Sequence, residues 1–373
     1  MAGETSKVRA ENVGSFLQPD SILEGRKRLQ EGAITAAELS EIEDREIRNV
    51  ISLQESAGLE VVTDGEFRRP GWADTVRYAN GIEPREGARS YPANVRVAAT
   101  GGLNFGGGGG FPTVVGKITP KAEPVGYEYL FLAANATART KYTMAAPSYH
   151  RRYWSDTLSP GESGYATCEE YLKDVRDWLH DVAIRLASEG CTYIQLDAPN
   201  YGSLCDPDNR AFHAEQGHNL DEQIAFDAAL DSSVFEGVDV TSALHVCRGN
   251  MPGGTWHSQG GYGVIAEPLF PNLDVDVVLL EYDSERAGDF GPISLINPGT
   301  VAVLGLLTTK EAPLESESDL RRRIDEAAGV RALDDLAIST QCGFASAANA
   351  PMTVEEQQAK IKLVSSLARS VWE

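Results

Sequence analysis

A histidine and a cysteine lie two residues apart in "ALHVCRGN", residues 243–250, directly after an apolar run. Successive side chains of a β-strand point to opposite faces, so on a strand His245 and Cys247 would share a face and could bind one ion. On a helix the same positions are about 200° apart and could not. An isolated pair of this kind is also typical of an ordinary buried strand. A metal site therefore requires further ligands from elsewhere in the chain.

Short apolar segments recur along the chain, with longer segments of helical period between them. We predict eight strands, over residues 8–13, 59–63, 142–145, 192–196, 242–246, 275–280, 301–307 and 336–340. We predict helices over residues 35–58, 168–190, 317–329 and 353–371. Thr35 and Thr353 each have Glu three residues on, which indicates capping boxes, and Gly58 and Gly190 suit helix ends. This alternation favours a single (β/α)₈ TIM barrel, with a doubly wound parallel sheet as the alternative.

No linker divides the 373 residues, so we expect one catalytic domain over residues 1–373. Residues 68–127 separate the second and third predicted strands and are expected to form an insertion. Within it, residues 101–118 include five consecutive glycines at 106–110. No G-K-[ST] follows them, so they do not form a phosphate loop, and we interpret the segment as a mobile flap over the barrel mouth.

Composition excludes several kinds of partner. The net charge of −22 argues against nucleic acid, which requires a basic surface. No apolar run reaches the roughly 18 residues of a membrane span, and the N-terminus lacks a signal-peptide pattern, so we expect a cytoplasmic protein. Five cysteines form an odd, sparse set that indicates reduced thiols or metal ligands rather than disulfides. An oligomer is compatible with these observations.

Chemistry in a (β/α)₈ barrel takes place at the carboxyl ends of the strands. The polar residues at the predicted strand ends are Ser15, Asp64, Glu66, Asp197, His245, Cys247, Glu281 and Cys342. Thiolate, imidazole and carboxylate are ligands that zinc prefers, so four of these residues form a candidate Zn²⁺ site: His245, Cys247, Glu281 and Cys342. Glu281 follows four apolar residues, where a buried carboxylate without a partner would be costly. The alternative places Cys342 in the core and Glu281 on the surface.

Six segments carry a resemblance to a known family: "RAENVGSFLQPD", "GLEVVTDGEFRRPGW", "YIQLDAPNYG", "LHVCRGN", "LLEYD" and "QCGFAS". In this order they resemble the catalytic barrel of the cobalamin-independent methionine synthases, especially their short single-barrel relatives. The resemblance implies that the four candidate residues are zinc ligands. It also implies a homocysteine site in which Ser15 lies near the carboxylate, while Glu66 and Asp197 hold the ammonium group. An ion pair of Glu66 with Arg68 or Arg69 is the alternative.

The implied activity is zinc-dependent transfer of a methyl group to a thiol, with homocysteine becoming methionine. The partners would be a small-molecule thiol and an alkyl donor such as methyl-folate or a methyl-corrinoid. Two-barrel members of the family carry a histidine after strand seven, whereas this chain has one barrel and reads "LGLLTTKEAP" there, which does not favour folate. His257, in the loop after strand five, is the candidate catalytic proton relay, and a solvent-exposed loop histidine without a catalytic role is the alternative.

Three other functions remain compatible with the sequence. Zinc-thiolate chemistry also serves C–S bond formation of the coenzyme M type, in which a thiol opens an epoxide. Four protein ligands could instead form a closed, non-catalytic zinc site. A metal-free decarboxylase resembling the uroporphyrinogen family would leave His245, Cys247 and Cys342 without a shared role.

Overall fold

The computed structural model describes residues 7–86, 110–251, 254–345 and 351–373. The strands are β1 (Ala10–Glu11), β2 (Val61–Val62), β3 (Ala79–Arg85), β4 (Phe111–Pro120), β5 (Arg139–Thr140), β6 (Tyr142–Ala145), β7 (Tyr193–Asp197), β8 (Thr241–Val246), β9 (Asn250–Met251), β10 (Thr255–Trp256), β11 (Val277–Glu281), β12 (Val301–Leu307) and β13 (Leu336–Thr340). The α-helices are α1 (Asp20–Gln30), α2 (Ala36–Ala57), α4 (Tyr129–Asn135), α5 (Ser159–Glu162), α6 (Cys168–Ser188), α7 (Pro199–Ser203), α8 (Pro207–Glu215), α9 (Leu220–Ser232), α10 (Gly263–Leu269), α11 (Glu317–Ala328) and α12 (Val354–Trp372).

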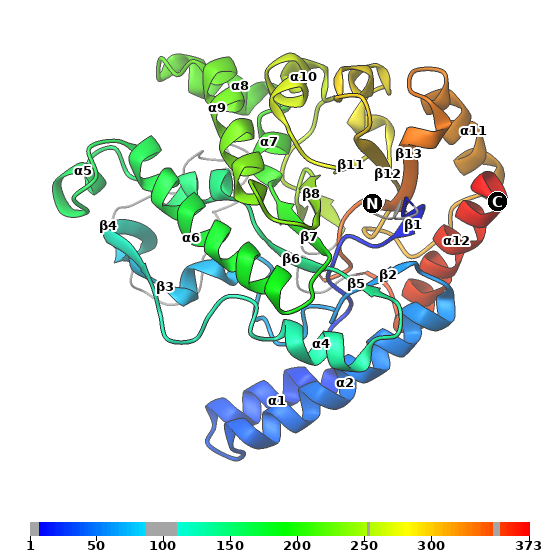
Figure 1. The fold of residues 1–373 in the computed structure, drawn as a ribbon, viewed down its shortest axis with the longest axis horizontal. Helices are drawn as coiled ribbons and strands as arrows, with labels where there is room; N and C mark the ends of the chain where they lie inside the picture. Colours follow the sequence, from blue (N-terminus) through cyan, green and yellow to red (C-terminus); the bar gives the residue numbers. More distant parts are fainter. Residues whose placement is uncertain (1–6, 87–109, 252–253, 346–350) are drawn as a thin grey trace.

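The strands form a curled parallel sheet with the long helices around its outside (Figure 1). Seven strands pair in the order β1-β13-β12-β11-β8-β7-β6, and β2 pairs in parallel with β5, which leads directly into β6. Neighbours around the sheet are thus consecutive along the chain, and the last strand, β13, pairs with the first. A doubly wound sheet would reverse its strand order instead, so the fold is the predicted (β/α)₈ TIM barrel.

Each predicted strand is found, but the first two are shorter than expected. Side chains rather than a backbone ladder connect β1 to β2 among the described residues. The Glu60 carboxylate accepts hydrogen bonds from the backbone N–H groups of Arg9 at 2.9 Å and Ala10 at 3.0 Å. The buried amide of Gln54 accepts from Asn12 Nδ2 at 3.0 Å and exchanges two hydrogen bonds with the Thr63 backbone, at 3.0 and 2.8 Å. These two side chains help to close the barrel, together with Thr63 Oγ1, which donates to Gly14 O at 2.6 Å, and Phe16 N, which donates to Gly65 O at 3.1 Å.

The apolar side chains of the strands alternate between two clusters. Val277 and Leu279 of β11 belong to a small cluster inside the barrel, together with side chains of the other strands. Val278 and Leu280 belong to the large cluster between the strands and the helices. Continuing the same alternation turns the next odd-numbered residue, Glu281, towards the barrel axis. The strands therefore position their carboxyl-terminal polar residues over the barrel interior.

The helix ends follow the predicted chemistry. Thr35 and Thr353 form capping boxes with Glu38 and Glu356, and Gly58 ends α2 at φ 83°. This left-handed conformation suits glycine because it has no Cβ. No helix within the described ranges combines the length and the apolar character that a bilayer crossing needs.

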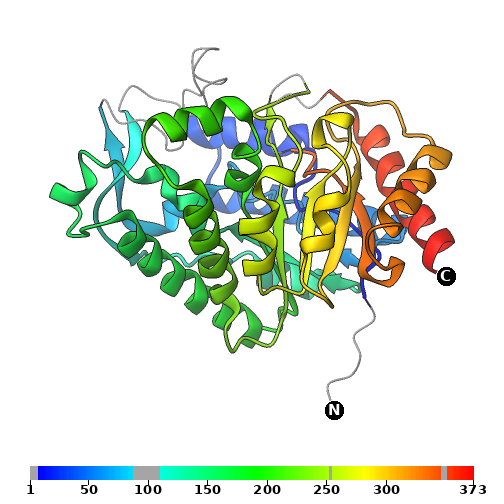
Figure 2. The same ribbon diagram turned by 90° about the horizontal axis from the view of Figure 1, so that it is seen from above.

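Residues between β2 and β6 form an antiparallel hairpin of β3 and β4. It lies at one side of the barrel beside α5 and α6, as both views show (Figures 1 and 2). Residues 111–118 of the predicted flap belong to the hairpin strand β4. Residues 101–109 of the flap lie outside the described residues, and its mobility stays a prediction.

We predict that Gln54→Leu lowers the free energy of unfolding by about 3 kcal/mol, because it leaves the buried N–H and C=O of Thr63 without their partners. Urea unfolding measures the change. The control is Gln30→Leu, which replaces an exposed glutamine of α1. Equal stability of both variants and the wild type would show that the side-chain closure is dispensable.

Candidate functional site

Three of the predicted ligands come together at the carboxyl ends of the strands. His245 lies in β8, Cys247 follows it, and Cys342 follows β13. The ligand atoms of these three side chains all lie within 4.8 Å of one another, and all three are buried. The spacing of His245 and Cys247 places both towards the barrel interior, like Ala243 of the same strand, which belongs to the interior cluster. We call these three residues the His-Cys-Cys cluster.

The His-Cys-Cys cluster has the chemistry of a metal site. Both ring nitrogens of His245 are buried without a hydrogen-bond partner among the described residues. The nearby sulfur of Cys342, together with burial, raises the pKa of Cys247 well above its ordinary value. A metal ion bound by one imidazole nitrogen and two sulfurs would give the His245 ring a partner and would turn the two thiols into thiolates. The donor set therefore fits zinc.

Glu281, the fourth predicted ligand, is buried beside the cluster but is not part of it. Its Oε1 accepts from Arg286 Nη2 at 2.6 Å and from Lys310 Nζ at 3.2 Å, and its Oε2 accepts from Arg248 N at 2.7 Å. Burial alone would raise the pKa of Glu281, but the charges of Lys310, Arg286 and Arg248 outweigh it and lower the pKa to about 2. The carboxylate is thus ionised and held by cations of the protein.

Two predicted substrate carboxylates, Glu66 and Asp197, lie close enough to influence each other. Burial and the charge of Asp197 raise the pKa of Glu66 to about 7, although Arg69 opposes this shift. Burial also raises the pKa of Asp197 to about 6. Thr143 Oγ1 donates to Glu66 at 2.9 Å, and Gln195 Nε2 donates to Asp197 at 2.7 Å. The protein supplies too little positive charge to keep both carboxylates ionised, so a cationic group of a ligand could bind between them.

Of the two alternative partners of Glu66, Arg69 forms an ion pair with it and Arg68 does not. Arg68 pairs with Glu43 and Asp44 instead. Arg69 Nη1 lies 3.9 Å from Glu66 Oε1, whereas Arg69 Nε donates to Glu128 at 2.9 Å. Among the described residues, Glu66 is the single residue other than glycine that has a positive φ, which is 61°. Strain of this kind is retained where the surrounding structure enforces it, often at functional sites.

Ser15, the third predicted substrate residue, lies against the loop that carries Cys342. Ser15 O accepts from Phe344 N at 2.9 Å, and Ser15 Oγ accepts from Ala345 N at 3.3 Å. A Cβ added at the intervening Gly343 would approach Ser15 Oγ to 2.1 Å, and a Cβ at Gly14 would approach Glu66 Oε1 to 2.6 Å. Ser15 therefore lies against the loop of Cys342, and its neighbour Gly14 lies against Glu66.

His257 is half-buried and packs closely on Gly249, where an added Cβ would meet the imidazole at 2.3 Å. Burial, helped by the charge of Arg152, lowers the pKa of His257 to about 4. The ring is therefore neutral at neutral pH and must first take up a proton in order to donate one. The Tyr149 ring lies 4.8 Å from the Trp72 ring, centroid to centroid, and the Arg152 guanidinium lies 4.8 Å from the Tyr149 centroid.

Two cationic residues that hold Glu281 were not identified from the sequence. Lys310 follows β12, all of whose residues are buried, and is itself buried in "LLTTKEAP". Lysines are rarely fully buried unless they are paired. A lysine so soon after an apolar strand could therefore have indicated a buried carboxylate partner. Arg286 follows Glu281 by five residues and offers no comparable pattern. Its role depends on the loop conformation after β11.

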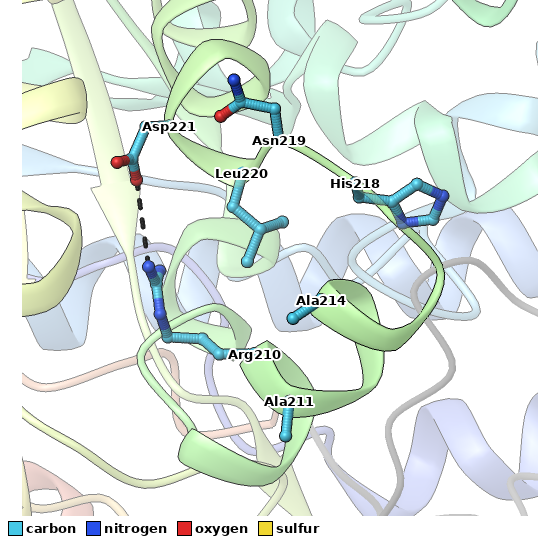
Figure 3. Close-up of a pocket in the computed structure, with 7 residues that line it drawn as sticks. All are labelled: Arg210, Ala211, Ala214, His218, Asn219, Leu220 and Asp221. Carbon is cyan, nitrogen blue, oxygen red and sulfur yellow. Dashed lines mark ion pairs between the residues drawn. The ribbon is translucent and has the colours of Figure 1, made fainter.

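The hollow between α8 and α9 contains none of the predicted site residues (Figure 3). It has a volume of about 390 Å³ and is lined by Arg210, Ala211, Ala214, His218, Asn219, Leu220 and Asp221. Arg210 and Asp221, two of the lining residues, form an ion pair at 3.8 Å (Figure 3). The clustered chemical groups therefore lie at the barrel mouth, not in this hollow.

Comparison with known proteins shows which family this chain resembles. A family profile described as the catalytic domain of the cobalamin-independent synthases matches residues 9–81. The protein YxjH of Bacillus subtilis (strain 168) is 33% identical over 375 residues, which cover 98% of this chain and 94% of YxjH. The methionine synthase of Sulfurisphaera tokodaii is 25% identical over 319 residues, 84% of this chain and 80% of that protein.

A solved Listeria monocytogenes protein assigned to the vitamin-B12-independent methionine synthases has a TM-score of 0.75 and 26% identity, and the match covers 100% of both chains. The fold and the cluster thus define a (β/α)₈ barrel with a buried set of soft ligands at its mouth. This chain belongs to the cobalamin-independent methionine synthase family, whose members are methyltransferases.

We predict that Glu66→Gln stabilises the metal-free protein at pH 8 but not at pH 4. The folded-state pKa of Glu66, about 7, lies above its ordinary value of 4.5, so folding favours the neutral carboxyl, and this contribution is lost as the pH rises through 7. The gain for the glutamine variant should reach at most about 3 kcal/mol above that pH. Urea unfolding at both pH values measures it. A difference that is independent of pH would contradict the shifted pKa.

Proposed function

We propose that this protein is a zinc-dependent methyltransferase that converts homocysteine to methionine. The observation that carries the proposal is the burial of His245, Cys247 and Cys342 within 4.8 Å of one another at the mouth of the barrel. Two ionisable carboxylates, Glu66 and Asp197, lie at the same mouth. The soft ligands suit zinc, and the carboxylates suit the amine of an amino-acid thiol.

His245, Cys247 and Cys342 would hold the metal as one neutral and two anionic ligands. Zinc supplies the stabilisation of a substrate thiolate at neutral pH, and a thiolate-rich set leaves that sulfur electron-rich. A set of neutral ligands would favour hydrolysis instead. Glu281, the fourth predicted ligand, would yield its position to the substrate thiol, which would distinguish this arrangement from a closed structural site.

The carboxylates select the acceptor. An ammonium group held between Glu66 and Asp197 would stabilise the ionised form of both and relieve their mutual repulsion. Ser15 and the backbone N–H groups beside it would receive the carboxylate of the same amino acid. A sulfonate thiol of the coenzyme M type has no cation for this pair and would be repelled by it.

The methyl group would pass directly to the acceptor sulfur. A C–S bond forms as the bond between the methyl group and its donor breaks, and the electron pair stays with the donor. His257 is proposed to move a proton for the departing donor. Methyl-folate, a methyl-corrinoid and smaller alkyl donors remain the candidate classes.

We predict that the zinc-loaded protein forms methionine from homocysteine with at least one of methyl-folate, methylcobalamin and a simple methyl donor. It should hold about one zinc per chain, and Cys247→Ser and Cys342→Ser should lose most of the metal and the activity, because a hydroxyl binds zinc less well than a thiolate. Metal analysis and product detection measure both.

Cys191→Ser is the matched control, since this buried thiol lies outside the cluster and donates to Tyr193 O at 3.3 Å, as a hydroxyl can. Full zinc content in a Cys247/Cys342 double variant would contradict the site. Stoichiometric zinc without methyl transfer to homocysteine, coenzyme M or cysteine would favour a closed structural site.

We predict that Glu66→Gln and Asp197→Asn each weaken homocysteine binding while zinc content stays unchanged. Losing one charge-assisted hydrogen bond costs about 1.5 to 3 kcal/mol, or roughly tenfold to a hundredfold in affinity. Coenzyme M, which lacks the amine, should bind these variants no worse than the wild type. Calorimetry measures both thiols. Unchanged homocysteine affinity in both variants would move the assignment to a thiol without an amine.

A further inference from the structure

A chain of polar side chains runs through the barrel interior to the predicted amine site at the mouth. Lys141 Nζ donates to Glu11 Oε2 at 2.7 Å and to Asn12 O. It also donates to Gln195 Oε1 at 2.9 Å, and Gln195 Nε2 in turn donates to Asp197 Oδ1 at 2.7 Å. Apolar side chains usually fill the interior of such a barrel. A charged pair and an amide here therefore call for a role that apolar residues could not fill.

This chain of hydrogen bonds is shielded from water. The side chains of Lys141 and Glu11 are 0% and 1% exposed, and Gln195 is fully buried. Tyr193 OH donates to both carboxylate oxygens of Glu11 at 3.1 Å. Buried hydrogen bonds of this kind are strong, and breaking one would leave a costly unpaired group. The side chains are therefore held firmly in one arrangement.

Lys141 decides which way the amide of Gln195 faces. An ammonium group can only donate hydrogen bonds, so the amide oxygen of Gln195 must face Lys141. The amide nitrogen then donates to Val13 O at 2.7 Å and to Asp197 Oδ1 at 2.7 Å. Both of its hydrogens are used in this way. A reversed amide would instead place its oxygen against two acceptors.

The oriented amide fixes the carboxylate of Asp197. Its Oδ1 accepts from Gln195, whereas no donor among the described residues reaches its Oδ2. The carboxylate cannot turn about its last bond without losing the hydrogen bond from Gln195. Asp197 is therefore held in one orientation, with Oδ2 left for a donor of the ligand.

We propose that Lys141 and Gln195 are positioning residues that fix Asp197 so that its Oδ2 receives the ammonium group of the acceptor amino acid. The proposal rests on the function proposed above and deepens it, because it extends the determinants of acceptor choice from the mouth into the barrel interior. Lys141 acts through Gln195, and Gln195 acts through the carboxylate of Asp197.

Two thiols that differ only in the amine test this proposal. Homocysteine and γ-mercaptobutyrate share a thiol and a carboxylate, but γ-mercaptobutyrate has no amine. In calorimetry on the zinc-loaded protein, Gln195→Met should weaken homocysteine binding about tenfold and leave γ-mercaptobutyrate binding and zinc content unchanged. Adding Gln195→Met to Asp197→Asn should cause little further loss, because Gln195 acts only through Asp197.

Gln54→Met is the matched control, since Gln54 is a buried glutamine whose amide donates to two backbone oxygens and not to Asp197. It should lower stability but leave the ratio of the two thiol affinities unchanged. If Gln195→Met does not fold, the double variant Lys141→Met/Glu11→Gln, which leaves no unpaired charge at this pair, takes its place with the same expected result.

The inference is overturned if the substitution does not weaken homocysteine binding, or if it weakens both thiols equally, as a merely structural role would. A wild-type protein that binds homocysteine no more tightly than γ-mercaptobutyrate would instead overturn the amine site of the proposed function, and the inference with it.

Discussion

The burial of two thiols and an imidazole in one small space at the barrel mouth is the constraint on which the rest of the site depends. Parallel strands turn every second side chain inwards, so His245 and Cys247 share the interior with Ala243 of the same strand. Closing the barrel at β13 brings Cys342 to them. Buried donors without partners are unfavourable, and a soft cation removes that cost while fixing the three side chains relative to one another.

The buried carboxylates around this cluster differ in how fully the protein neutralises them. In the barrel interior, Lys141 Nζ donates to Glu11 at 2.7 Å and to Gln195 at 2.9 Å, and Gln195 in turn orients Asp197. Cations lower the pKa of Glu281, whereas burial raises those of Glu66 and Asp197. The mouth therefore combines one carboxylate that the protein satisfies with two that a cationic ligand can satisfy. A ligand with both a thiol and an amine could therefore bind the metal cluster and these two carboxylates at the same time.

Local patterns predicted much of this arrangement. The apolar strands, the capping boxes and the His245–Cys247 spacing depend on residues close in sequence, and the structure has them. The short β1 and β2 were not predicted, because Gln54 and Glu60 replace a backbone ladder through contacts between distant segments. Glu281 stays a predicted metal ligand, because its carboxylate is visible in the sequence and is buried beside the cluster. The pairing with Lys310 depends on the loop after β12 folding back over β11, which no local pattern reveals.

The central claim is that His245, Cys247 and Cys342 hold zinc at the mouth of the barrel. An anomalous difference map at the zinc edge, from crystals of the zinc-loaded protein, tests it most directly. We expect one dominant peak about 2.3 Å from both sulfurs and about 2.0 Å from a ring nitrogen of His245. A map with no peak between these three side chains, or with its dominant peak elsewhere in the protein, would contradict the account.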